Sequence, residues 1–196
     1  MIDMKKEAGF TLVEMLVVMG IIAMLAVAFM SSFSYVQRLA WKHQSQTIVS
    51  NAATALTLYL QKERGWGDLE NKTEFDSDVC LILKNAGVFD STVKSSGDEK
   101  ATASIDRYGL LDAWGQRKLK SNPDLPENIA SQHRIQFRLD LNLDGKVDSS
   151  ENSPNGLQIR AAALVWSRGL DGKDDSSSTG RYPKDDVLSF QIAGGR

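Results

Sequence analysis

The hydrophobic pattern of this chain is dominated by one run near the N-terminus. From Phe10 to Met30 the residues are apolar except for Thr11 and Glu14. At about 1.5 Å per residue, a helix of this length can cross a hydrocarbon core of about 30 Å. The run therefore predicts a transmembrane helix over residues 10–30.

Helix signals continue beyond this run, because neither Pro nor Gly occurs between Met30 and Gly65. We expect one helix from about Phe10 to about Arg64, with an amphipathic second half over residues 31–64. Apolar side chains recur in that half at three- and four-residue spacings. They are Trp41, Ile48, Ala52, Ala55, Leu56 and Tyr59. This stripe should pack under a globular head formed by residues 65–196.

The single cysteine of the sequence, Cys80, excludes an intramolecular disulfide. It falls in a short helix predicted over residues 78–86, with Ser77 as N-cap and Gly87 as terminator. We interpret Cys80 as a buried core residue rather than a reactive thiol. The head must therefore be stabilised without a disulfide of its own.

Strand signals lie in the last third of the chain. Ile135, Phe137 and Leu139 alternate with polar residues, which is typical of a half-buried strand. Residues 157–166 and 187–192 predict two more strands. We expect an α+β fold, with about three antiparallel strands laid on the long helix.

Composition limits the functional classes. With 196 residues and 42% hydrophobic content, the chain has room for one globular unit besides the helix. The net charge is −2, so no overall basic bias predicts nucleic-acid binding. The only histidines, His43 and His133, have no nucleophile–base pattern or phosphate loop around them, and we expect surface or capping roles for both. No enzyme is predicted.

Glu14 needs a partner, because an ionised side chain near the centre of a spanning helix costs about 2.5 to 3.5 kcal/mol even on lenient scales. The residues from Gly9 to Glu14 read Gly-Phe-Thr-Leu-Val-Glu and follow a short leader, residues 1–9, that contains Lys5 and Lys6. A tolerated charge near the end of a signal anchor is the alternative interpretation.

This segment resembles the N-terminal signature of the type IV pilin and pseudopilin family. The resemblance implies that a prepilin peptidase cuts between Gly9 and Phe10 and that Phe10 is then N-methylated. It also implies that Glu14 faces the terminal amine of Phe10 in a neighbouring subunit of a fibre. Opposite charges attract strongly in low dielectric, although desolvation offsets much of the gain.

A second, weaker resemblance lies in residues 110–117. Asp112, Trp114 and Gly115 match a segment that opens the sheet in major pseudopilins of type II secretion, whereas Ala113 and Arg117 stand where that segment has Pro. We expect Trp114 to anchor the core and Gly115 to form the turn behind it.

Residues 140–151 fit a twelve-residue calcium loop at each ligand position, with Gly145 at the sharp turn. The candidate ligands are Asp140, Asn142, Asp144, Lys146 through its carbonyl, Asp148 and Glu151. The flanking sequence does not suit an ordinary EF-hand, because a strand enters the loop and Pro154 blocks a long exiting helix. A solvated turn rich in Asp and Asn is the alternative.

A second acidic loop runs from Ser167 to Val187 and resembles the calcium loop of major pseudopilins. The resemblance makes Asp171, Asp185 and Asp186 candidate calcium ligands. The segment between them is long, which leaves the roles of Asp174 and Asp175 open. A plain acidic loop is the alternative.

Together these features predict a structural subunit of a pseudopilus-like fibre in type II protein secretion, stabilised by calcium. The expected partners are a prepilin peptidase, copies of this chain, other pseudopilins and an inner-membrane assembly platform. The expected location is the bacterial inner membrane, crossed once with the head in the periplasm, and the assembled fibre in the periplasm or at the cell surface.

Two alternatives stay open. One is a type IV pilin or minor pilin that serves adhesion, motility or DNA uptake. The other is a membrane-anchored, calcium-dependent binding module that never polymerises, which would leave Glu14 unexplained.

Overall fold

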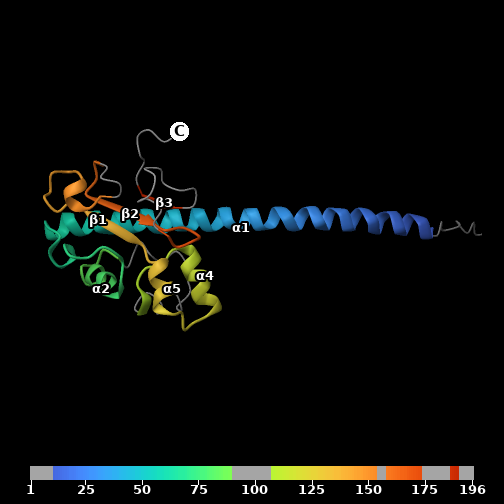
Figure 1. Cartoon of the computed structure of the whole chain (residues 1–196), viewed down its shortest axis with the longest axis horizontal. Coiled ribbons are helices and arrows are strands. Elements are labelled where there is room, and N and C mark those ends of the chain that lie inside the picture. Colours follow the sequence, from blue (N-terminus) through green and yellow to red (C-terminus); the bar gives the residue numbers. More distant parts are fainter. Residues whose placement is uncertain (1–10, 90–106, 154–157, 174–185, 190–196) are drawn as a thin grey trace, which may run out of the picture. The chain divides into compact units, whose positions relative to one another are not determined.

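The computed structural model describes residues 11–89, 107–153, 158–173 and 186–189 (Figure 1). The fold is α+β, as the sequence predicts, with a long N-terminal helix followed by a small antiparallel sheet. The chain forms two compact units, Met1–Ala40 and Trp41–Arg196. In chain order, the elements are α1 (Leu12–Glu63), η1 (Gly67–Leu69), α2 (Ser77–Asn85), α4 (Ala113–Ser121), α5 (Glu127–Gln132), β1 (Gln136–Leu139), η2 (Ser149–Glu151), β2 (Ala163–Ser167) and β3 (Val187–Leu188).

Helix α1 agrees closely with the predicted helix. It ends where Arg64 takes a left-handed conformation with φ of 57°, and Gly65 follows. Within the unit Met1–Ala40 its large apolar side chains are exposed. Among the described residues, it is the one helix long and apolar enough to cross a membrane.

The second half of α1 forms one wall of the head core. Ile48, Ala52, Ala55, Leu56 and Tyr59 are buried as predicted, and Trp41 is partly buried against the same cluster. Two further buried residues of this face, Ser45 and Val49, were not predicted. Ser45 is buried without penalty because its hydroxyl oxygen accepts a hydrogen bond from the backbone N–H of Ala113, at 3.0 Å.

The sheet has the order β1-β2-β3 and is antiparallel throughout, with Phe137 opposite Val165 and Ser167 opposite Val187. The predicted strand over residues 157–166 is too long. Val147 and Ile159 form only an isolated bridge before β2 begins at Ala163. The predicted third strand is described only as far as residue 189, and β3 within it has two residues.

Strand β1 is more buried than the half-buried strand that was predicted. Of the three polar residues of the alternating pattern, Arg134 and Gln136 are 6% and 4% exposed, and Arg138 is partly buried. The reason is non-local. The segment from Thr73 to Phe75 hydrogen-bonds along one edge of this strand, and its Glu74 side chain accepts hydrogen bonds from both Arg134 and Gln136.

One prediction about the short helix α2 needs correction, namely its N-cap. Asp76 caps α2, accepting the N–H of Val79 at 2.8 Å, whereas Ser77 was expected to do so. Gly87, with φ of +71°, does follow the end of that helix. Cys80 is buried, as predicted, and its thiol lies 3.9 Å from the carbonyl oxygen of Phe75.

The segment around Trp114 begins a helix rather than opening the sheet. Asp112 is the N-cap of α4, and Trp114 lies in the first turn, where it is buried as expected. Gly115 does not form a turn. A Cβ at this position would lie 2.6 Å from the Cβ of His133, so the glycine allows that residue to approach the helix closely.

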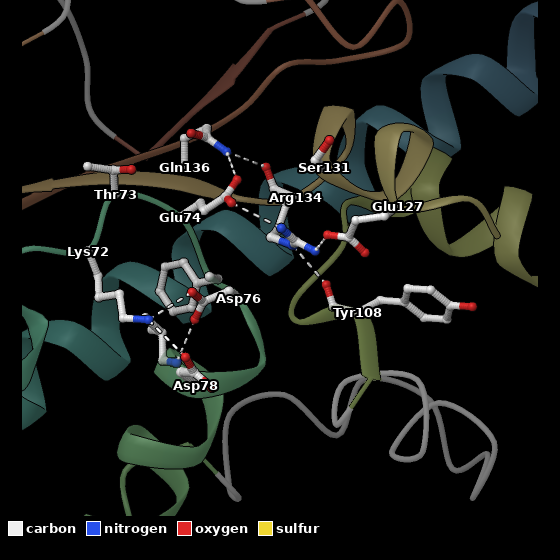
Figure 2. Close-up of polar contacts among 12 residues, drawn as sticks. Lys72, Thr73, Glu74, Asp76, Asp78, Tyr108, Glu127, Ser131, Arg134 and Gln136 are labelled. Atoms are coloured by element: carbon white, nitrogen blue, oxygen red, sulfur yellow. Dashed lines mark hydrogen bonds and ion pairs between the residues drawn. The ribbon is translucent and has the colours of Figure 1, made fainter. Parts of the chain in front are cut away.

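Ion pairs centred on the buried side chain of Arg134 and on Lys72 connect parts of the head. Figure 2 shows Arg134 between two chain segments: its Nη1 donates to Glu74 at 3.0 Å, its Nη2 donates to Glu127, and its Nε donates to the carbonyl of Tyr108 at 2.9 Å. Nearby, Lys72 bridges Asp76 and Asp78, each at 3.0 Å. The Arg134 contacts join residues far apart in sequence.

Candidate functional site

The N-terminal site begins with a capping arrangement at the start of α1. The backbone N–H and the hydroxyl of Thr11 both donate to Oε2 of Glu14, at 2.9 and 3.0 Å, and the N–H of Glu14 donates to the hydroxyl oxygen of Thr11 at 3.3 Å. This reciprocal pattern is a capping box, and the spacing Thr-x-x-Glu could have predicted it. Gly9 and Phe10 lie outside the described residues.

These hydrogen bonds orient Glu14 but do not neutralise its charge. In the part of the chain that the structure describes, no cationic group lies within ion-pair distance of its carboxylate, and the residue is exposed on the helix surface. A carboxylate in an apolar environment requires a cation or a proton. The capping box therefore holds the carboxylate of Glu14 in a fixed position on the exposed surface of α1.

The first acidic loop is closed by its own terminal carboxylates. Asp140, which is 2% exposed, accepts the N–H groups of Asp144 at 3.1 Å and Gly145 at 2.7 Å. Glu151, which is 7% exposed, accepts the N–H groups of Leu141 at 2.6 Å and Asn142 at 3.2 Å. The two buried carboxylates thus hold both ends of the loop together.

The remaining candidate ligands of this loop form local turns. The Asn142 side chain accepts the N–H of Asp144 at 2.9 Å, and Asp144 accepts that of Lys146 at 2.9 Å. Asp148 caps η2 and accepts both the N–H and the hydroxyl of Ser150, at 2.8 and 2.6 Å. These hydrogen bonds lower the pKa of Asp148, the hydroxyl more than the N–H.

Two features show how well this loop suits calcium, namely the chemistry of its ligand atoms and the positions of its side chains. The donors are all oxygens, in the number that calcium prefers, and Gly145 makes the turn with φ of +83°. Each carboxylate oxygen that accepts one N–H keeps a lone pair for a cation. However, nowhere in the described ranges do three or more acidic, histidine or cysteine side chains gather closely enough to hold a metal ion. The chemistry fits calcium, whereas the side chains are turned to backbone N–H groups.

The second acidic loop is described only in part. The Asp171 side chain accepts the N–H of Lys173 at 2.9 Å, and Asp186 is 8% exposed just before β3. Asp185 lies outside the described residues, as do Asp174 and Asp175. The second ligand set therefore stays a prediction.

A buried polar network connects the Trp-Gly segment to the start of the second loop. Asp112 accepts the hydroxyl of Ser167 at 2.6 Å and the N–H of Gly115 at 2.7 Å, and all atoms of its side chain are buried. His133 places Nδ1 3.4 Å from the same carboxylate, and its Nε2 lies 2.7 Å from Nζ of Lys118. Because a lysine ammonium only donates, Nε2 must accept and Nδ1 must carry the proton.

His133 is therefore not the surface or capping residue expected from the sequence, since it is 1% exposed. His43, in contrast, lies exposed on α1. The order of the network also differs from that of a nucleophile–base triad, because Asp112 rather than His133 contacts the serine hydroxyl. The network positions α4 and the second loop relative to each other.

Comparison with known proteins finds a match to a motif near the N-terminus and none to the whole chain. A family model described as the prokaryotic N-terminal methylation motif matches residues 4–30. This match supports a type IV pilin-like protein with a membrane-anchoring N-terminal helix. No curated protein and no solved structure matches the chain.

Proposed function

We propose that this chain is a structural subunit of a pseudopilus-like fibre in type II protein secretion. The observation that carries the proposal is the start of α1, where Thr11 fixes the carboxylate of Glu14 on an otherwise apolar surface inside the matched motif. A helix that served only as an anchor would gain nothing from a buried charge. A subunit that must align with its neighbour in one register would gain from a charge that pairs across the contact.

In this proposal α1 serves two successive roles. It first holds the subunit in the bacterial inner membrane, with the head in the periplasm, and a prepilin peptidase cleaves between Gly9 and Phe10. An assembly platform in that membrane then brings subunits together, and the new amine of Phe10 on one subunit neutralises Glu14 on the next. Pairing the two charges removes the main cost of keeping Glu14 in an apolar core.

The assignment to secretion rather than to a pilus rests on two parts of the head. The segment from Asp112 to Gly115 and the loop that starts at Ser167 each resemble parts of major pseudopilins. They meet in the structure through the 2.6 Å hydrogen bond between Asp112 and Ser167. A type IV pilin or minor pilin is the second candidate, favoured by the same N-terminal motif.

The assembly role is tested by changing Glu14→Ala in the full chain, with Glu63→Ala as a matched control on the exposed surface of the same helix. We expect Glu14→Ala to abolish fibres recovered from cells while the head keeps its melting temperature, and we expect Glu63→Ala to leave fibres intact. Intact function of Glu14→Ala would instead favour the membrane-anchored module, and normal fibres of this variant would refute the assembly role of Glu14.

Calcium is a separate part of the proposal. The ion would be held by oxygens of Asp140, Asn142, Asp144, Asp148 and Glu151 with the carbonyl of Lys146, and it would supply positive charge to a loop with four carboxylates. At a free calcium concentration of about a hundred times the dissociation constant, the head would gain about 2.7 kcal/mol. In the second loop, Asp171, Asp185 and Asp186 are proposed ligands on the basis of the resemblance alone.

The calcium test must measure a response to the ion rather than stability alone. Asp140 and Glu151 accept backbone N–H groups in the loop, so replacing either destabilises the head with or without calcium. Asp144→Ala is the better variant, because Asp144 is exposed and accepts one N–H. We expect calcium to raise the melting temperature of the wild type more than that of Asp144→Ala. If calcium changes neither, the loop is an Asx-rich turn without a metal.

A further inference from the structure

An open depression of about 360 Å³ lies on the head beside α4. Its walls are largely apolar and include Trp41, Trp114, Leu125 and the exposed Leu170. We call this depression the socket. It is lined only by residues of the unit Trp41–Arg196.

Polar features of the socket indicate what it can bind. Trp114 is 6% exposed and contributes to the apolar wall of the socket. The guanidinium of Arg117 stacks 4.1 Å from the centre of the Trp41 ring. Helix α4 carries Arg117, Lys118 and Lys120 and no acidic residue. A ligand with an apolar body and an anionic rim would complement this surface.

The first acidic loop has that chemistry. Leu141 and Leu143 are 47% and 52% exposed at its tip, and Asp144 beside them is exposed. Leu143 has φ of +58°, a conformation that a leucine rarely adopts and that the buried carboxylates of the loop enforce. We call residues 141–144 the knob. With four carboxylates against Lys146 alone, residues 140–151 remain negative even with a bound divalent ion.

The knob and the socket lie at opposite ends of the head. The indole of Trp66, just beyond the end of α1, donates to the carbonyl of Asp140 and so fixes the knob near that end. Trp41 in the socket lies 22 residues before Glu63, which corresponds to about 33 Å along the helix. Figure 1 shows the same separation within the head, with η2 near the end of α1 and α4 further back along it.

We propose that the knob of one copy of this chain docks in the socket of another copy further along the fibre. Leu141 and Leu143 fill the apolar depression, and Asp144 approaches Arg117. The proposal rests on the proposed function, because it names the head-to-head contact of the same fibre. Since the two surfaces differ and lie at opposite ends of one subunit, the contact is heterologous and propagates rather than closing as a dimer.

The decisive variant is Leu143→Asn in the full chain. Asn tolerates a positive φ better than Leu does, so this variant should keep or raise the melting temperature of the head. It also removes the apolar knob, so we expect the yield of sheared fibres to fall at least fivefold. Leu81→Gln is the matched control, because Leu81 is 56% exposed on α2, away from both surfaces. A purely structural role for Leu143 would not separate stability from assembly in this way.

Disulfide cross-linking tests whether the socket is occupied by the knob of a second copy of this chain. In a Cys80→Ala background, the pair Leu143→Cys and Leu170→Cys should give a ladder of disulfide-linked multimers on oxidation in cells. The pair Leu81→Cys and Leu170→Cys should not. Fibres that form normally with Leu143→Asn, or multimers absent with the first pair, would overturn the knob and socket while leaving the proposed function intact. If the wild type makes no fibres and the chain is not cleaved, the proposed function itself fails.

Discussion

Replacing Asp112 tests the buried network that joins α4 to the second acidic loop. Its carboxylate accepts the hydroxyl of Ser167 at 2.6 Å and the N–H of Gly115 at 2.7 Å, and both donors are buried. Asp112→Ala leaves both donors without an acceptor and removes the N-cap of α4. A buried donor left unsatisfied costs about 1 to 3 kcal/mol, and breaking such a charged network costs about 3 to 5 kcal/mol.

The expected order of variants makes this prediction specific. Asp112→Asn keeps one acceptor oxygen and should cost about 1 to 2 kcal/mol, and Ser167→Ala, which removes one of the two donors, about 0.5 to 1.5 kcal/mol. Asp124→Asn is the control, because the Asp124 side chain is 86% exposed and its pair with Arg107 contributes about 0 to 1 kcal/mol.

Thermal unfolding of the full chain in detergent, followed by circular dichroism, measures these costs. For a unit of this size, a loss of 3 to 5 kcal/mol lowers the melting temperature by about 6 to 20 °C. The reasoning is refuted if Asp112→Ala melts within about 1 °C of the wild type, or if Asp124→Asn is as destabilising as Asp112→Ala.

Three further predictions concern the head. Gly115→Ala should lower the melting temperature, because its Cβ would lie 2.6 Å from that of His133, whereas Gly65→Ala meets no atom within 4 Å and should not; equal effects would contradict the packing argument. Arg134→Met should cost about 1 to 3 kcal/mol in denaturant unfolding, because the buried carbonyl of Tyr108 loses its donor, and a neutral result would show that the ion pairs contribute nothing. Hydrogen bonds to Asp76 and then Asp78 raise the pKa of Lys72 above 10.5, so its stabilising contribution is complete below pH 10.5 and is lost as the pH rises through the folded pKa. The difference in melting temperature between wild type and Lys72→Met should therefore shrink at alkaline pH, and a difference that grows there would have the wrong sign.

The long helix could be predicted from the sequence because its signals are local. Apolar spacing and the absence of Pro and Gly are readable along the chain, and they placed the buried face of α1 correctly from Ile48 to Tyr59. Ser45 was missed because its burial depends on the N–H of Ala113, 68 positions away in sequence. Pattern arguments treat such a serine as solvent-exposed.

The same distinction explains the errors in the head. His133, Arg134 and Gln136 are buried by segments distant in sequence, so no periodicity within residues 133–139 could reveal it. For α4 a local signal did exist, since Asp112 is a good N-cap and Lys118 and Lys120 lie in the last turn. The resemblance to a sheet-opening segment favoured a turn at Gly115 and obscured that signal.

The candidate sites show which features of a site the spacing of residues in the sequence can predict. In residues 140–151 the spacing predicted a calcium loop, with an Asx-rich turn as the alternative. The turns themselves are present, because Asx turns and the turn at Gly145 are local features. Spacing could not tell whether carboxylates meet a metal or backbone N–H groups, since that depends on what the loop binds. The capping box of Thr11 and Glu14 was readable but went unnoticed beside the stronger motif.

Intact-mass measurement of the mature protein from its native membrane tests the central claim most directly. The account predicts a chain that begins at Phe10, with the nine residues of the leader removed and one methyl group added to the new N-terminus. A chain that retains Met1 to Gly9, or one cut after the apolar run rather than before it, would contradict the account.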